Sequence, residues 1–169
     1  MEHLSDDVIA LRRLAASDVD AWLAGEDDEQ IRWFEFPRAA TRADVERAIA
    51  GWQASWNEGG PVRQWGIVLR SDGALVGGVE LRDLGDRRVN LSYVVFPDWR
   101  QRRLATRASR LALGYARTEL GATAAVIKVL DGNVASLGVA RALDACEVGS
   151  EKSDRGGRFV VFEVALAKP

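Results

Sequence analysis

The chain has 169 residues, which is enough for one domain, residues 1–169, that buries roughly two thirds of the surface of its unfolded chain. Its 23 basic and 25 acidic side chains are well mixed and leave a net charge of −2, so we expect no nucleic-acid partner and no attachment to an anionic membrane. One cysteine, Cys146, and one histidine, His3, exclude an intrachain disulfide and a His/Cys zinc site, and without a long apolar run the reducing cytoplasm is the expected compartment.

The chain is predicted to begin with a strand and a helix. Residues 8–14 alternate enough for a strand, and Ser17 is placed to cap a helix that includes Leu23. The acidic run 26–29 follows this helix directly. It fits either a solvated helix end or a rim that attracts a cationic amine.

Aromatic side chains mark the next two segments. A loop broken by a proline holds a mostly aromatic run that fits a small satellite of the core: Trp33, Phe34, Glu35 and Phe36. A second helix opens at Thr41. Apolar residues recur in it at spacings of four, three and four and predict one face packed on a sheet: Val45, Ile49, Trp52 and Trp56.

Residues 64–70, 74–84 and 88–96 are three strand-like runs separated by glycine-containing turns, which predicts an antiparallel meander. The pair Gly77–Gly78 inside the second run is typical of a bulge or of a close approach between backbones.

A helix over residues 104–120 and a buried strand over 124–130 come next. A strand, this helix and another strand form a right-handed crossover, so the strands on either side of the helix should be parallel. A short helix (134–143) and a closing strand (158–166) complete an α/β fold with a mixed sheet, mostly antiparallel with one parallel pair.

The segment from Tyr93 to Ala108 is the most informative part of the sequence. An apolar strand ends at Pro97, and a loop with three arginines leads directly into a helix. The first N–H groups of a helix are unpaired and carry partial positive charge, so this layout favours an anion such as a phosphate. A surface helix end rich in arginine is the alternative.

The loop reads Arg100-x-x-Arg103-x-Ala105 and resembles the pyrophosphate loop of the GNAT acyltransferase superfamily, Gln/Arg-x-x-Gly-x-Gly/Ala. The segment 131–136 (DGNVAS) is similar to the Asn-x-x-Ser segment of the RimJ/RimL-like branch, which acetylates N-terminal amines of ribosomal proteins or small amines. The chain departs from the pattern at Arg103, where the family has glycine, and at Asp144–Ala145, where it usually has Gly-Phe.

The resemblance implies the superfamily's fold, with helices on both faces of the sheet, and acetyl-CoA or another acyl-CoA as co-substrate. It places the diphosphate on the loop and the first helical turn, residues Arg100, Gln101, Arg102, Arg103, Leu104, Ala105 and Thr106. It places the pantetheine arm along the strand at Val94 and Val95, with its amides held by Asn133. Asn133 as a simple helix cap is the alternative. In the family, the region that corresponds to the proline-broken loop covers the acceptor site, so the resemblance implies substrate contacts from Trp33, Phe34, Glu35 and Phe36, and a satellite of the core is the equal alternative.

Acyl transfer to an amine needs a neutral amine, a polarised carbonyl and a proton for the departing thiolate. We expect Ser136 to donate that proton, unless it only faces the first helical turn. Glu80 is the best candidate base, although a surface position is equally compatible; the branch often carries a glutamate where this chain has Asn90. The tyrosine that many members use as an acid is expected to be missing, because Tyr93 lies on a strand and Tyr115 on a core face.

These observations predict an acyl-CoA-dependent N-acyltransferase that moves an acetyl group to a primary amine by direct attack in a ternary complex. The alternative is a degenerate acyl-CoA-binding or sensing protein without turnover, and a purely structural protein would require the arginine loop to be a coincidence. The acceptor, a small molecule or a protein N-terminus, the acyl chain and the choice between monomer and homodimer stay open.

Overall fold

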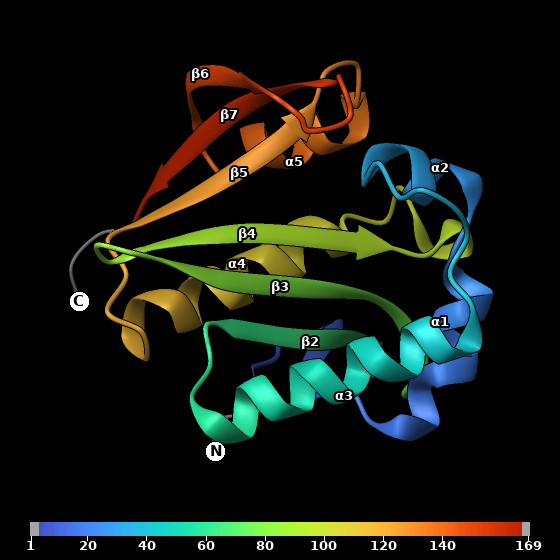
Figure 1. The fold of residues 1–169 in the computed structure, drawn as a ribbon. Coiled ribbons are helices and arrows are strands. Elements are labelled where there is room, and N and C mark those ends of the chain that lie inside the picture. Colours follow the sequence, from blue (N-terminus) through green and yellow to red (C-terminus); the bar gives the residue numbers. More distant parts are fainter. Residues whose placement is uncertain (1–3, 167–169) are drawn as a thin grey trace.

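The computed structural model describes residues 4–166, and His3 lies outside them. Within this range the strands form a seven-stranded sheet in the order β1-β2-β3-β4-β5-β7-β6 (Figure 1). Neighbouring strands are antiparallel except β4 and β5, which are parallel. The predicted mixed sheet is confirmed. The strands are β1 (Ile9–Arg12), β2 (Val62–Leu69), β3 (Leu75–Gly85), β4 (Arg88–Val95), β5 (Ala124–Leu130), β6 (Cys146–Lys152) and β7 (Arg158–Ala165).

Helices cover both faces of the sheet, with α4 behind it and α3 in front of it in Figure 1. The helices are α1 (Val19–Gly25), α2 (Asp28–Trp33), α3 (Arg42–Glu58), α4 (Leu104–Thr118) and α5 (Val134–Ala142). Small residues four apart on α4, Ala108, Ala112 and Ala116, are fully buried and let this helix lie close to the strands. Val45 and Ile49 are buried on α3, as the apolar stripe predicted.

The glycine pair on β3 lies where backbones approach each other closely. A side chain at Gly77 would come within 2.1 Å of the carbonyl oxygen of Val94 on β4, and one at Gly78 within 2.6 Å of the Trp22 ring. The register of β2 against β3 also shifts between Ile67 and Val68, opposite this pair. The predicted bulge and close approach are therefore confirmed, and they bring α1 close to the middle of the sheet.

The parallel strands β4 and β5 pair only over a short stretch. Residues 88–90 of β4 face residues 124–126 of β5, and beyond Asn90 the two strands separate. On its other edge, β5 pairs with β7 along its whole length. A gap thus opens in the middle of the sheet toward the C-terminal end of β4, where α2 lies (Figure 1).

Two elements differ from the sequence-based expectation. The acidic run and the aromatic segment were expected to be a helix end and a loop, but Asp28–Trp33 forms the separate helix α2. Its N-cap is Asp27, whose Oδ1 accepts a hydrogen bond from the Gln30 N–H at 2.9 Å. The edge strand β6 was not predicted, because all its side chains are exposed and no face of it is apolar.

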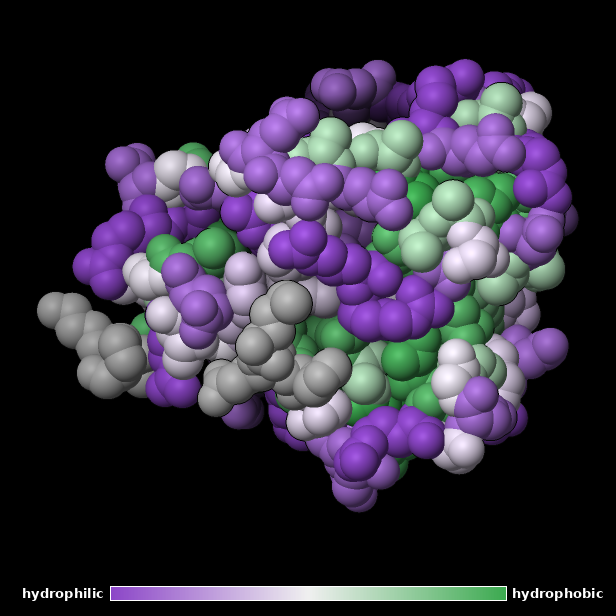
Figure 2. All heavy atoms as spheres, turned by 90° about the horizontal axis from the view of Figure 1, so that it is seen from below, coloured by the Kyte–Doolittle hydropathy of each residue, from purple (hydrophilic) through white to green (hydrophobic). Residues whose placement is uncertain are grey.

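Seen from below, hydrophobic side chains gather on one half of the molecule and are crossed by hydrophilic ones (Figure 2). Within residues 4–166 we find no helix with the length and apolar character needed to cross a membrane.

Candidate active site

The loop before α4 presents a run of free backbone donors. Among the described residues, no hydrogen-bond partner is found for the N–H groups of residues 101–106, and the first bond of the helix runs from the Arg107 N–H to the Arg103 carbonyl at 3.1 Å. Six consecutive donors at the positive end of a 15-residue helix form a strong site for an anion. The predicted anion loop has the geometry that this role needs.

Arg103 adopts the conformation for which the family's pattern has glycine. It is the N-cap of α4, with φ 59° and ψ 17° in the left-handed region. The backbone therefore turns as it would with glycine, although the Cβ atom makes this turn costly by about 1 kcal/mol. The exposed Arg103 guanidinium has no partner among residues 4–166, so its charge remains available at the loop.

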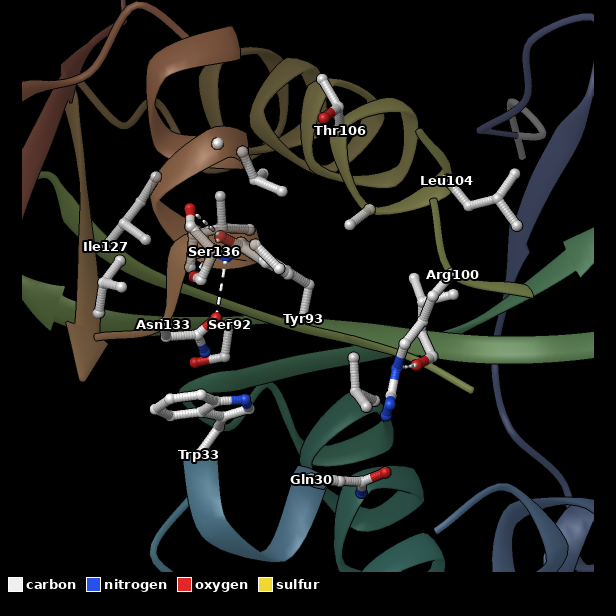
Figure 3. A pocket seen from close by; sticks show the side chains of 18 of the residues that line it. Gln30, Trp33, Ser92, Tyr93, Arg100, Leu104, Thr106, Ile127, Asn133 and Ser136 are labelled. Atoms are coloured by element: carbon white, nitrogen blue, oxygen red, sulfur yellow. Dashed lines mark hydrogen bonds between the residues drawn. The ribbon is translucent and has the colours of Figure 1, made fainter. Parts of the chain in front are cut away.

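A cavity of about 870 Å³ runs from this loop through the gap beside β4 to α2 (Figure 3). Most of the predicted site residues line it: Trp33, Phe34, Val94, Val95, Arg100, Gln101, Arg103, Leu104, Ala105, Thr106, Asn133 and Ser136. Four predicted residues do not line it: Glu35, Phe36, Glu80 and Arg102. The structure thus brings the loop, the strand and the Asn-x-x-Ser segment together around one cavity.

The edge of β4 offers backbone groups to the cavity. The Phe96 N–H bonds to the Val76 carbonyl on β3 at 2.9 Å. Because successive residues of a strand direct their backbone groups to opposite neighbours, those of Tyr93 and Val95 point to the gap. Val95, rather than Val94, therefore presents its N–H there.

Asn133 and Ser136 occupy the start of α5, and each is held by a short contact. Asn133 Oδ1 accepts a hydrogen bond from the Ser136 N–H at 3.0 Å, so Asn133 caps the helix (Figure 3). Its amide nitrogen has no hydrogen-bond partner among the described residues. The Ser136 hydroxyl lies 2.8 Å from the Tyr93 hydroxyl, and either can donate.

Tyr93 corrects the expectation that the site lacks a tyrosine. Its ring reaches from β4 across the gap toward α5 and lines the cavity. Burial raises the pKa of Tyr93 to about 12, and the bond with Ser136 lowers it slightly, so the phenol is neutral at physiological pH. A strand position hid this role in the sequence, because the gap that turns Tyr93 into a cavity residue depends on where β4 and β5 separate.

Arg100 does not direct its charge into the anion loop. Two of its nitrogens bind both oxygens of Asp27, at 2.7 and 2.8 Å, and Nη1 also lies 2.5 Å from Glu29 Oε2. Its Nε donates to the Val95 carbonyl at 3.1 Å. The Arg100 guanidinium holds the pKa of Asp27 below its ordinary value, mainly through these hydrogen bonds. Within the acidic run, Asp27 and Glu29 are thus tied to Arg100, while Asp28 and Glu29 are exposed in the first turn of α2.

The α2 end of the cavity, which we call the acceptor wall, is formed by Gln30, Trp33 and Phe34. Gln30 is 6% exposed, and its Oε1 has no hydrogen-bond partner among the described residues. Asn90 and Ser92 of β4 also line the cavity, with the Asn90 amide donating to Ser92 Oγ at 3.0 Å. Sequence reasoning did not assign Gln30 or Ser92. For Ser92 the available signal was a polar residue alternating with apolar ones along a strand, whereas Gln30 lies on α2 and had no such signal.

Glu80 lies one strand away from the cavity. Its pairing partner on β4 is Ser92, so the two side chains are neighbours on one face of the sheet. Burial raises the pKa of Glu80, while Arg82, whose Nη2 is 3.3 Å away, and Trp52 lower it. A half-buried carboxyl group next to a cavity-lining hydroxyl is compatible with a base that acts through Ser92.

The remaining predicted residues have other contacts. Glu35 Oε1 accepts a hydrogen bond from the Ser153 hydroxyl at 2.8 Å and so ties this segment to the β6–β7 turn. Phe36 stacks on Phe34 with ring centroids 5.5 Å apart. The Arg102 guanidinium lies over the Trp99 ring at 4.7 Å. No cluster of three potential metal ligands is found in the part of the chain that the structure describes.

Comparison with known proteins agrees with this geometry. A sequence model of the acetyltransferase (GNAT) domain matches residues 9–145. Solved structures with the same fold include a GNAT-family acetyltransferase from Bacillus anthracis (TM-score 0.83, 15% identity, 96% of this chain and 98% of that one).

Two further structures of this fold have more specific descriptions. One is RimL, a ribosomal L7/L12 alpha-N-protein acetyltransferase (TM-score 0.83, 14% identity, covering 97% and 94% of the chains). The other is the microcin C7 self-immunity acetyltransferase MccE, in complex with acetyl-CoA and AMP (TM-score 0.79, 15% identity, covering 95% and 93%). No curated protein matches by sequence. With a family match over most of its length, the chain belongs to the GNAT acetyltransferase family.

Proposed function

We propose that this acetyltransferase moves the acetyl group of acetyl-CoA to a primary amine by direct attack within a ternary complex. The observation that carries the proposal is the run of six unpaired N–H groups at residues 101–106, which opens onto a cavity of about 870 Å³. Such a run suits a diphosphate, because each N–H can donate to a phosphate oxygen without any rearrangement. The thioester supplies the activated acetyl group.

The gap beside β4 suits an extended amide-containing arm. The Val95 N–H faces this gap and can donate to a carbonyl oxygen, while the Asn133 amide nitrogen can donate from the opposite side. Hydrogen bonds from such fixed groups stabilise the negative charge that develops on a carbonyl oxygen during attack. The acceptor wall lines the far end of the cavity, and we place the amine at this end.

Two proton transfers complete the reaction. The amine nitrogen forms a bond to the carbonyl carbon, the carbon–sulfur bond breaks, the nitrogen loses a proton and the sulfur takes one. We assign the proton donor for sulfur to Ser136, whose oxygen can accept a hydrogen bond from the Tyr93 hydroxyl 2.8 Å away. Glu80, through Ser92 or a water molecule, is the best placed group to receive the proton of the amine.

The acceptor is a primary amine, on a small molecule or at a protein N-terminus. RimL, which shares the fold, is described as an alpha-N-protein acetyltransferase, and MccE, which also shares it, as a microcin C7 self-immunity acetyltransferase. These descriptions support the general class and leave both acceptors as candidates. The rival proposal is binding without turnover. It would explain the departures from the family pattern at Arg103 and Asn90 and the expected lack of a tyrosine in the site. Two of these three points lose their force, because Arg103 keeps the turn expected of glycine and Tyr93 reaches the site.

The test combines binding with turnover. Calorimetry with acetyl-CoA should show binding, and thiol release should be measured with a panel of small amines and of peptides with free N-termini. Release that depends on one amine class supports the proposal. Binding with no release for any amine favours the sensing protein, and no binding of any CoA species contradicts both.

A further inference from the structure

The helix that carries the acceptor wall has very little apolar anchorage. α2 is six residues long, far below the length at which an isolated helix is stable. Among its residues only Gln30 is buried, and the Oε1 atom of that side chain has no partner within residues 4–166. Polar contacts at its first turn must therefore set its position against the sheet.

Arg100 supplies those contacts from the end of β4. Its guanidinium binds both oxygens of Asp27, the N-cap of α2, and one oxygen of Glu29 in the first turn. Glu29 in turn accepts a hydrogen bond from the Trp33 indole N–H at 3.2 Å. Arg100 also donates to the Val95 carbonyl, so one side chain joins the edge of β4 to the acceptor wall.

The same contacts leave Arg100 poorly suited to bind phosphate. Four hydrogen bonds from its Nε and Nη atoms are directed to Val95, Asp27 and Glu29. Two carboxylates beside the guanidinium would also repel an incoming diphosphate. Among the described residues neither Arg102 nor Arg103 has a carboxylate partner, and of these two only Arg103 lines the cavity, so its positive charge is available there.

We propose that Arg100 is a positioning residue for the acceptor, which holds α2 and its wall against β4, rather than a ligand of the acyl donor. This rests on the proposed function for the meaning of the acceptor wall. The arrangement implies that Arg100 and Asp27 act as one unit. Loss of either should loosen α2 and weaken acceptor binding, while the anion loop keeps its donors.

The structural part of the test is amide hydrogen exchange of α2 followed by mass spectrometry. In the unmodified protein, the amides of Ile31 and Phe34, which bond to Asp27 and Gln30 carbonyls at 3.0 Å, should exchange slowly. Arg100→Gln and Asp27→Asn should each speed their exchange about tenfold. Asparagine is itself a good N-cap, so Asp27→Asn removes the ion pair and retains the helix start.

A matched control is available elsewhere in the chain. Arg12 binds both oxygens of Asp18 at 2.7 Å, in the same two-point geometry and away from the cavity. Arg12→Gln should leave exchange in α2 unchanged. Unchanged exchange in α2 for Arg100→Gln and Asp27→Asn, or fast exchange already in the unmodified protein, would overturn the proposal.

The functional part separates the two substrates. Calorimetry should give an acetyl-CoA Kd within threefold of the unmodified value for both variants. With an amine identified by the panel, both should raise the KM of the amine about tenfold at little cost in kcat, and the double variant should be no worse than either single one. A tenfold weaker acetyl-CoA Kd with unchanged acceptor KM would make Arg100 a phosphate ligand. Failure of the unmodified protein to bind acetyl-CoA would count against the proposed function, whereas the exchange result stands on its own.

Discussion

The hydroxyl groups of Tyr93 and Ser136 lie 2.8 Å apart and connect β4 to α5 across the gap in the sheet. The Ser136 backbone is fixed by Asn133, so the position of the Ser136 oxygen is set from two sides. With its pKa raised to about 12 by burial, Tyr93 keeps its proton and can donate it to Ser136 Oγ. The hydroxyl hydrogen of Ser136 is then directed away from Tyr93 and available to a departing sulfur.

Tyr93→Phe tests this connection, since it removes one oxygen and preserves the ring. We expect kcat to fall about tenfold, at the low end for acid catalysis because water can partly replace the donor. The KM for acetyl-CoA should stay within twofold. Ser136→Ala should have a similar effect, and the double variant should be no slower, which steady-state thiol release would show. Full activity of Tyr93→Phe would show that Ser136 needs no hydrogen bond from Tyr93.

Arg103→Gly tests the left-handed N-cap of α4. Glycine relieves the strain at this residue but makes the unfolded chain more flexible, so the free energy of unfolding should change by less than about 1 kcal/mol. Because the side chain is exposed at the cavity, its loss should weaken acetyl-CoA binding about fivefold in calorimetry, as expected for one solvent-screened ionic contact. Arg102→Ala, which removes an equal charge from the Trp99 side of the loop, should have a smaller effect. Tighter binding by Arg103→Gly would show that the arginine obstructs the diphosphate.

Glu80→Gln tests the candidate base by its pH dependence. The deprotonated form is the active one, so the rate should climb as pH rises through a pKa above the ordinary 4.5, and the variant should lose this limb and about 100-fold or more in rate. If deprotonation of the amine in solution limits the rate, the rising part of the pH–rate profile should follow the acceptor's own pKa and should remain in Glu80→Gln.

The raised pKa of Glu80 also has a consequence for stability. A carboxyl group with a higher pKa in the folded state favours folding at low pH, and this contribution is lost as pH rises through the folded value. Glu80→Gln should therefore increase the free energy of unfolding at pH 7 relative to the unmodified protein and show no such gain near pH 4. Denaturant titrations at the two pH values would measure it, and a loss of stability at pH 7 would show that the contact with Arg82 dominates.

Trp33→Ala tests the acceptor wall. Trp33 lines the cavity, and its removal should raise the KM of the amine at least fivefold while the KM for acetyl-CoA stays the same. Trp56 provides the contrast. Its indole donates to the Gln64 carbonyl and its ring packs on Trp65, so Trp56→Ala should lower the melting temperature without a selective effect on the amine. Equal changes in both KM values for Trp33→Ala would argue against an acceptor role.

The sequence predicted those features that depend on local chemistry. The anion loop, the stripe on α3 and the glycine pair follow from spacing and residue type, and all lie where they were expected. The features that were missed depend on partners distant in sequence. In the sequence, Asp27 is only part of a charged run, and its partner Arg100 lies 73 residues later. Tyr93 is only a strand residue in the sequence, and it lines the cavity because β5 separates from β4.

The hydrogen-bonded pairing between β4 and β5 covers only three residues of each strand, so the sheet is least connected at its centre. One half, built on β1 to β4, and the other, built on β5, β7 and β6, share few hydrogen bonds directly. A molecule that fills the gap would contact both halves and stabilise their association. Saturating acetyl-CoA should therefore do more than raise the melting temperature: the calorimetric transition should become narrower, as two loosely joined halves come to unfold as one unit.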